Sequence, residues 1–350
     1  MEFASDNTSG ATPEVLAAVV AANAGYASSY GADQWTEAAQ KAVRLAFEAP
    51  EAAVHLVATG TVANALSAAI LCPPWGAIYS HEAAHVEVDE CGAPEFYIGG
   101  GKLVLTGGDH GKITPEGLAT RLARTPQGDV HHIQHGMLSL TNLTEAGTAY
   151  SPAEVAALAA LAHKAGIGVH MDGARFANAL AATGATPAEM TWKAGVDVLS
   201  FGASKNGAMA VEAVVIFDPA KSWEFELRRK RAGHLFSKSR FLGAQMGAYL
   251  RDGGWLAHAA HANRMGQRLA QGLSALPGGR LIHPADGNIV FAAFPRALHV
   301  RATEAGAHYY LWPFDQTLEG PGEEEVAARF VCSWSTTEAD VDRLLAVLAG

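Results

Sequence analysis

The sequence predicts an α/β protein in which a large domain with a mostly parallel sheet, covered by helices on both faces, precedes a smaller α+β domain. Three observations support this. The 350 residues are 49% hydrophobic and 17% charged, which suffices for a large core. Short apolar runs alternate with helical patterns over residues 52–217, as in β–α–β units. After about residue 240, long helices lead into short strands.

The elements of the first part follow from local signals. Pro13 opens and Gly25 closes a helical pattern, and residues 34–49 form a second one. The apolar run 52–59 predicts a short buried strand. Further strands are expected at 77–80, 102–106, 137–140, 168–171, 197–201 and 213–217, with helices at 60–72, 151–166 and 173–183.

The second part predicts a different arrangement. Its expected helices are 240–251, 255–275 and 337–349, and its expected strands lie near 281, 289–294, 308–312 and 329–334. The acidic segment 318–328 is expected to be a flexible loop, and the glycine-rich segments 99–102 and 107–111 to be hairpin turns. We expect an N-terminal arm (1–20), a large domain (21–245) and a small C-terminal domain (246–350), joined by the helix over 255–275.

Composition excludes several classes of protein. The formal net charge of −10 argues against binding to nucleic acid or to anionic membranes. The three cysteines are far apart, which predicts neither a disulfide framework nor a thiolate zinc site. The first residues do not resemble a signal peptide, and no apolar run reaches the roughly 20 residues that a spanning helix needs. These features predict a cytoplasmic protein.

The most informative functional pattern lies between residues 167 and 205. Asp172 ends one apolar run, Arg175 follows, and Lys205 ends another run. Because ligands of parallel sheets collect at the carboxyl ends of the strands, Asp172 and Lys205 are expected to face one crevice. A pyridoxal phosphate (PLP) enzyme needs a lysine that forms a Schiff base with the cofactor and a carboxylate that pairs with its pyridinium nitrogen. The planar fork of Arg175 can grip an amino-acid carboxylate.

A phosphate site is expected where a helix begins. Thr59, Gly60 and Thr61 follow a predicted strand and open a helix, so they offer hydroxyls, free N–H groups and the positive end of a helix dipole. An ordinary helix cap has the same residues, so this motif is weak by itself. The basic cluster 228–231 is either a solvated helix face or the source of a cation that reaches the phosphate, across a subunit boundary in one version of this hypothesis.

Two further side chains fit the same site. A histidine ring such as that of His85 can stack on a flat cofactor and move protons near neutral pH, although it is one of 15 histidines. Arg329 lies among apolar strand residues, where a charge either reaches the surface or is paired. With Arg175 it would form a two-sided clamp on a carboxylate.

The segment HEAAH (81–85) suggests an alternative, a zinc hydrolase, because H-E-x-x-H places two histidines one helical turn apart. The segment directly follows a predicted strand, and no long helix or third ligand follows it. We therefore expect no metal here.

Together these segments resemble the low-specificity L-threonine aldolases, which are PLP-dependent aldolases of fold type I. The resemblance covers most of the chain, in FASDN (3–7), YGADQWT (30–36), TGTVAN (59–64), AHVEVDECGAPEF (84–96), HMDGARFANA (170–179), FGASKNG (201–207) and RFVCSW (329–334). It implies a carbon–carbon lyase that cleaves L-threonine, L-allo-threonine and related β-hydroxy-α-amino acids to glycine and an aldehyde. It also implies a homotetramer, built from dimers that share active sites.

The resemblance implies roles for individual residues. The catalytic residues are Lys205, which forms the Schiff base, with His85, His131 and Asp172. The cofactor-binding residues are Thr59, Gly60, Thr61, His85, Asp172, Arg175, Lys205 and Lys230, with Arg231 and Lys238 as alternative cations. The substrate-binding residues are Ser5, Asn7, Arg175 and Arg329.

Two positions depart from the family pattern. Asn142 replaces a glutamine and Ser204 replaces a threonine, which could alter side-chain preference. The preferred substrate, including phenylserine, and the stereochemical preference stay open. The base that takes the hydroxyl proton is His85, His131 or a water. Another PLP enzyme of this fold, a β-eliminating lyase, a transaminase or a racemase, is the alternative function.

Overall fold

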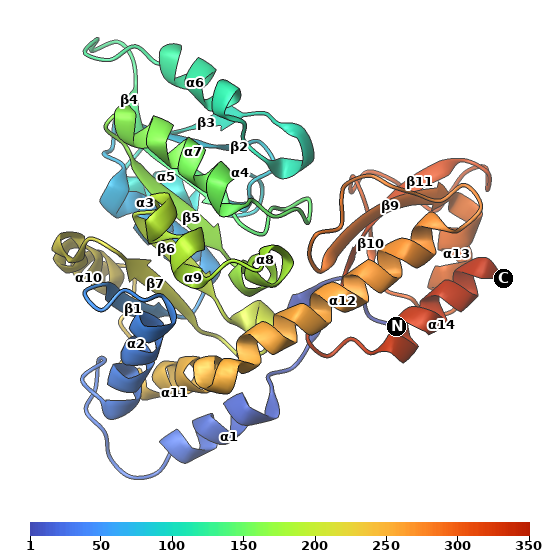
Figure 1. Cartoon of the computed structure of the whole chain (residues 1–350), viewed down its shortest axis with the longest axis horizontal. Coiled ribbons are helices and arrows are strands. Elements are labelled where there is room, and N and C mark those ends of the chain that lie inside the picture. The colour runs from blue at the N-terminus through green and yellow to red at the C-terminus, as the bar shows by residue number, and fades with distance from the viewer.

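A computed structural model describes all 350 residues and confirms the two-part α/β fold (Figure 1). A seven-stranded sheet has the order β1-β7-β6-β5-β4-β2-β3, and a four-stranded antiparallel sheet has the order β10-β11-β9-β8. From β6 to β3 the large sheet is parallel, whereas β7 runs antiparallel to both neighbours. Its strands are β1 (Ala53–Val57), β2 (Gly76–His81), β3 (Lys102–Thr106), β4 (Gln134–Thr141), β5 (Gly168–Gly173), β6 (Val198–Gly202) and β7 (Glu212–Ile216).

Helices cover both faces of the large sheet, so nearly every residue of β1, β2, β6 and β7 is buried. On one face, Val57, Val198 and Val214 pack with Leu66 of α3 (Gly60–Leu71). Their chain neighbours face the other way, into the largest core cluster. The helices of that second face are α2 (Gln34–Ala46), α6 (Pro115–Ala123), α7 (Pro152–Lys164), α8 (Phe176–Thr183) and α11 (Arg240–Leu250).

The small antiparallel sheet has its own core around Val290, Phe294 and Phe330. It consists of β8 (Arg280–Leu281), β9 (Ile289–Pro295), β10 (Tyr310–Leu311) and β11 (Glu325–Val331), with helices α12 (Gly254–Ser274), α13 (Arg296–Glu304) and α14 (Glu338–Ala349). The long helix α12 runs from the large sheet to the small one, and both termini lie beside the small sheet (Figure 1).

The N-terminal segment crosses from the small sheet to the large one. The backbone of Phe3 donates to His308 O (2.8 Å) and accepts from Val331 N (2.8 Å), and its ring is fully buried in the small core. A 3₁₀ turn, η1 (Asp6–Thr8), and helix α1 (Pro13–Ala22) follow. The segment 3–8 is therefore fixed between the two parts.

Several local expectations were wrong. Segment 318–328 is not a loop throughout, because β11 begins at Glu325 and Arg296 holds the preceding turn through Pro321 O (2.9 Å) and Glu324 (2.6 Å). The glycine-rich segments are not hairpin turns, because β2 and β3 are parallel. Five helices were not predicted: α6 and α13 above, with α4 (His85–Val88), α5 (Ala93–Ile98) and α9 (Pro187–Met190). Of α10 (Ser222–Arg231), only the basic end, 228–231, was expected as a helix face. None of the helices combines the length and the apolar character that spanning a bilayer requires.

Candidate active site

The segments that carry the expected site residues leave the large sheet at one edge. Asp172 pairs with Thr141 and Ser200 near the ends of their strands. Glu212, the first residue of the antiparallel strand β7, pairs with both Gly202 and Val57. The carboxyl ends of β1, β4, β5 and β6 therefore meet, as open α/β sheets place their ligand sites.

Asp172 is rigidly held at this edge and is 2% exposed. Its Oδ2 accepts from Asn64 Nδ2 (2.9 Å) and its Oδ1 from Ala174 N (3.0 Å). Asn64 lies on α3, so the helix that opens at Gly60 also orients this carboxyl. An oriented, desolvated carboxyl of this kind suits a protonated ring nitrogen.

Lys205 lies in the 3₁₀ turn η4 (Ser204–Asn206) directly after β6. The residue is half-buried, and its amine forms no hydrogen bond or ion pair with the protein. The nearby Glu212 already has a partner, because its Oε2 accepts a hydrogen bond from Ala203 N (2.6 Å). Burial raises the pKa of Glu212 to about 7. An amine without a protein partner is available for covalent attachment of a carbonyl group.

His85 begins α4, after β2, and joins a polar chain that leads to Asp172. Its Nδ1 lies 2.8 Å from Glu90 Oε1, which also accepts from Asn64 Nδ2 (2.8 Å). Its Nε2 lies 3.6 Å from Asp89. The hydrogen bond with Glu90 raises the pKa of His85, while burial raises the pKa of Glu90. Sequence reasoning missed Asn64 and Glu90, although both lie inside quoted family segments.

The start of α3 offers a place for an anion. Thr59 caps the helix, and its hydroxyl accepts from Val62 N (3.3 Å), while the N–H groups of Gly60 and Thr61 have no acceptor. A Cβ atom on Gly60 would meet nothing within 4 Å, so the space in front is open. A hollow of about 740 Å³ beside this turn is lined by Ala58, Tyr30, Lys230 and Lys238, but not by Arg231.

The two arginines of the expected clamp come together, but one is already paired. Arg175 Nε and Nη2 bind the carboxylate of Asp6 at 2.7 and 2.9 Å, in a buried ion pair. Asn288 Nδ2 donates to the same carboxylate (3.0 Å). Arg329, on β11, has no hydrogen bond or ion pair, and burial and the charge of Arg175 lower its pKa. Sequence reasoning named Ser5 and Asn7 but passed over Asp6 between them.

Ser5 and Asn7 lie at the same edge, since η1 contacts η4. The Ser5 hydroxyl accepts from Asn7 N (3.1 Å), and the Asn7 side chain is exposed. His131 does not join them within the chain. It lies exposed before β4, whose first residue, Gln134, pairs with the first residue of β2, Gly76, at the opposite edge of the sheet. The eight residues of β4 separate the two edges.

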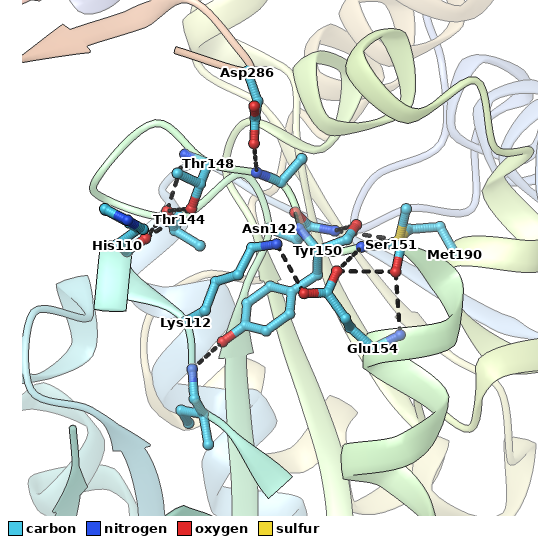
Figure 2. A network of polar contacts seen from close by, with 12 residues as sticks. His110, Lys112, Asn142, Thr144, Thr148, Tyr150, Ser151, Glu154, Met190 and Asp286 are labelled. Atoms are coloured by element: carbon cyan, nitrogen blue, oxygen red, sulfur yellow. Dashed lines mark hydrogen bonds and ion pairs between the residues drawn. The ribbon is translucent and has the colours of Figure 1, made fainter. Parts of the chain in front are cut away.

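A further carboxylate, Glu145, lies in the loop after β4. Hydrogen bonds hold this loop in place at several points (Figure 2). Within the loop, the Asn142 side chain bonds the backbone N–H and C=O of Tyr150 (3.1 and 3.2 Å), and Thr144 bonds Thr148 (2.8 Å). From the small part, the Asp286 carboxylate accepts from Ala149 N (3.0 Å). Glu145 itself has no hydrogen bond or ion pair, and its charge acts on the pKa values of His85, Arg175 and Arg329. Sequence reasoning gave it no role.

The helical zinc motif does not form. His81 is the last residue of β2 and His85 the first of α4, so the two histidines do not share a helix. Both ring nitrogens of His81 contact backbone atoms, Gly108 O and Ala83 N, at 3.0 Å. The residues HEAAH therefore lack the geometry that made a zinc hydrolase an alternative.

Known proteins give an independent comparison. The profile of the beta-eliminating lyase family matches residues 2–295. The low-specificity L-threonine aldolase of Pseudomonas sp. (strain NCIMB 10558) is 42% identical over 345 residues, covering 99% of this chain and 96% of that protein. The protein of the same name from Pseudomonas aeruginosa is 42% identical over 343 residues, covering 98% and 94%.

Solved structures agree. The threonine aldolase of Leishmania major superposes with a TM-score of 0.91 at 27% identity, covering 99% of this chain and 98% of that one. The serine palmitoyltransferase of Sphingomonas wittichii shares the fold, with a TM-score of 0.70 at 18% identity, covering 100% and 86%. The chain therefore belongs to the low-specificity L-threonine aldolases, within the beta-eliminating lyase family.

Proposed function

We propose that this protein is a PLP-dependent aldehyde-lyase that cleaves L-threonine, L-allo-threonine and related β-hydroxy-α-amino acids to glycine and an aldehyde. One observation carries the proposal. An unpaired lysine amine, a buried and oriented carboxyl, and an unpaired arginine lie at one edge of the sheet. The names of the relatives at 42% identity support the choice of reaction.

The residues present fit PLP. Asp172 would pair with the ring nitrogen, Lys205 would hold the aldehyde carbon, and the ring of His85 would lie against the cofactor. The free N–H groups of Gly60 and Thr61 would bind the phosphate, with Lys230 or Lys238 supplying positive charge from the hollow beside them. Bound there, the cofactor supplies an electron sink for the electron pair of the breaking Cα–Cβ bond.

The arginines bind and orient the substrate. Arg329 offers a full guanidinium to the substrate carboxylate, and Arg175 offers the donors that Asp6 leaves free. Because Asp6 neutralises one of the two cations, the pair presents about one net charge to one carboxylate. Ser5 and Asn7 line the same region. A fixed carboxylate restricts rotation about the Cα bonds, which is how positioning lowers the barrier.

The hydroxyl proton needs an acceptor at the same edge. We assign this role to His85, which begins α4 after β2 and whose Nε2 is the ring nitrogen not held by Glu90. We propose that this nitrogen takes the proton of the β-hydroxyl, directly or through a water.

The test is to incubate the purified protein and PLP with L-threonine, L-allo-threonine and phenylserine. Glycine and the matching aldehyde are expected, with a visible absorption band from the lysine-bound cofactor. Lys205→Ala should abolish both turnover and the band. Release of ammonia with an oxo acid would instead favour β-elimination, and a colourless, fully active wild type would overturn the PLP assignment.

We further propose a cytoplasmic homotetramer, a dimer of dimers. Two large apolar side chains that line the hollow near α3, Tyr30 and Phe236, are exposed. Exposed apolar groups of this size, gathered together, are typical of subunit interfaces. All three cysteines are free, which suits a reducing compartment. Light scattering coupled to size-exclusion chromatography tests the assembly, and a monomer would refute it.

A further inference from the structure

A buried polar chain connects His85 with Asp172 through two residues that have no role so far. His85 Nδ1 lies 2.8 Å from Glu90 Oε1, Asn64 Nδ2 donates to the same oxygen (2.8 Å), and Asn64 Nδ2 also donates to Asp172 Oδ2 (2.9 Å). The single amide nitrogen of Asn64 thus uses both of its protons on two carboxyls. A flipped amide would set its oxygen against both of them, so the orientation is fixed.

Four acidic groups act on the His85 ring, and they differ in burial. Asp89 and Glu90 come from its own segment, Asp172 from β5, and Glu145 from the loop after β4. Asp89, 3.6 Å from Nε2, has a side chain that is 81% exposed, whereas the side chain of Glu90 is fully buried. Water screens the first contact and not the second. Glu90 is therefore the dominant partner of the ring.

We propose that Glu90 is a positioning residue, which keeps a proton on Nδ1 of His85 and so leaves Nε2 as the nitrogen that exchanges a proton with the substrate. A carboxylate that accepts from one ring nitrogen fixes the tautomer and makes the other nitrogen more basic. Asn64 supports this role, because its N–H stabilises the ionised form of Glu90. The other oxygen of Glu90, Oε2, has no partner, so all hydrogen bonds of this carboxylate are made at Oε1, with Asn64 and His85.

Asn64 also ties this device to the proposed cofactor site. Its two N–H groups hold Glu90 and Asp172 at a fixed separation, so the histidine and the carboxyl for the ring nitrogen share one scaffold on α3. The inference rests on the proposed function only for the identity of the group that meets Nε2. The tautomer itself is a property of the protein.

Nitrogen NMR of the histidine-labelled holoenzyme tests the proposal, with His85→Gln used to assign the signal. Wild type should show a protonated Nδ1 and an unprotonated Nε2 above the pKa of His85. Glu90→Gln should lower that pKa by about 1 unit or more, the range for losing a close charged partner. Asp89→Asn, which removes the exposed carboxylate beside the same histidine, should shift the pKa of His85 much less. Glu90→Asp should recover part of the shift.

The acid limb of the kcat/KM profile for threonine should move to lower pH in Glu90→Gln, together with the NMR pKa. Wild type with its proton on Nε2, or equal shifts in Glu90→Gln and Asp89→Asn, would overturn the proposal. The wild-type tautomer decides the matter even if Glu90→Gln does not fold. A protein that holds the expected tautomer but cleaves no β-hydroxy amino acid would refute the proposed function and leave this inference standing.

Discussion

Asp6 and Arg175 form the most deeply buried ion pair of the protein, and an exposed pair with the same geometry exists elsewhere. In both Arg175–Asp6 and Arg268–Asp342, the guanidinium spans the carboxylate with distances of 2.7 and 2.9 Å. Burial would raise the pKa of Asp6, but the charge and hydrogen bonds of Arg175 outweigh it and hold the pKa below its ordinary value. The two pairs therefore allow a matched comparison.

We predict that Asp6→Asn destabilises the protein by about 3–5 kcal/mol, because it leaves the buried guanidinium of Arg175 without its paired carboxylate. It should also change KM for threonine, since Arg175 loses its orientation. Asp342→Asn, at the exposed pair, should cost about 1 kcal/mol or less. Denaturant unfolding and steady-state kinetics measure both. Equal losses in the two variants would show that burial does not make the Asp6 pair special.

Glu212 predicts a pH dependence of stability. Burial raises its pKa to about 7, so between about pH 4.5 and 7 the folded protein holds a proton that the unfolded chain releases. The contribution of Glu212 to the free energy of unfolding is therefore complete below its pKa in the unfolded chain. It is lost as the pH rises through its pKa in the folded protein, at up to about 1.4 kcal/mol per pH unit. Glu212→Gln keeps an acceptor for Ala203 N, and its Tm should fall less than that of wild type between pH 5 and 7. Parallel curves from calorimetry would contradict this.

At the scale of elements, the start of α3 makes a testable contribution. Gly60 and Gly254 are each the first residue of a helix, and a Cβ on either would meet nothing within 4 Å. An aspartate suits a helix N-terminus, so neither Gly60→Asp nor Gly254→Asp should lower the Tm of the apoprotein. Only Gly60→Asp sets a carboxylate where the phosphate is proposed to bind. We predict that it alone weakens PLP binding, by at least about tenfold, or 1.4 kcal/mol.

Titration of the apoproteins with PLP, followed by absorbance, gives the comparison. Unchanged PLP affinity in Gly60→Asp would place the phosphate elsewhere. A comparable loss in Gly254→Asp would show that the substitution acts through the fold.

Sequence patterns predicted elements better than contacts between them. The strands of the large sheet appeared as apolar runs, and Asp172 and Lys205 were readable because each follows such a run. Helix α6 was missed although Pro115 opens it as Pro13 opens α1, and Thr114 caps it. The strand β11 was placed too late because its first residue, Glu325, resembled part of an acidic loop. In the structure Glu325 pairs with Arg280 across the sheet edge.

The partners of the site residues could not be predicted from the sequence. Asn64 meets Asp172 across 108 positions, and Asp6 meets Arg175 across 169. Local periodicity carries no information on such pairs, because they depend on how α3 and the N-terminal segment pack. The role that family resemblance gives to His131 stays a prediction, and within one chain His131 lies before β4, at the opposite edge of the sheet from Asp172.

At the scale of the whole molecule, the N-terminal segment joins the two parts. The division into an arm (1–20), a large domain (21–245) and a small domain (246–350) stays a prediction. Phe3 is fully buried in the small core, three residues before Asp6. We predict that Phe3→Ala costs about 3–5 kcal/mol through the cavity it leaves and also raises KM, because Asp6 loses its anchor. Phe314→Ala, at a largely exposed ring, should change neither by much. A destabilised Phe3→Ala variant with a normal KM would show that Phe3 does not help to position Asp6.

The hydrogen bond between Val331 N and Phe3 O also has a consequence for biosynthesis. Because most of the sequence lies between Phe3 and Val331, Val331 is synthesised tens of seconds after Phe3, at roughly 5–20 residues per second. Until then Phe3 has no small core to enter, and Arg329 has not been made. A nascent chain can therefore pair the strands of its large sheet, yet it cannot complete the proposed carboxylate-binding site until Arg329 has been synthesised.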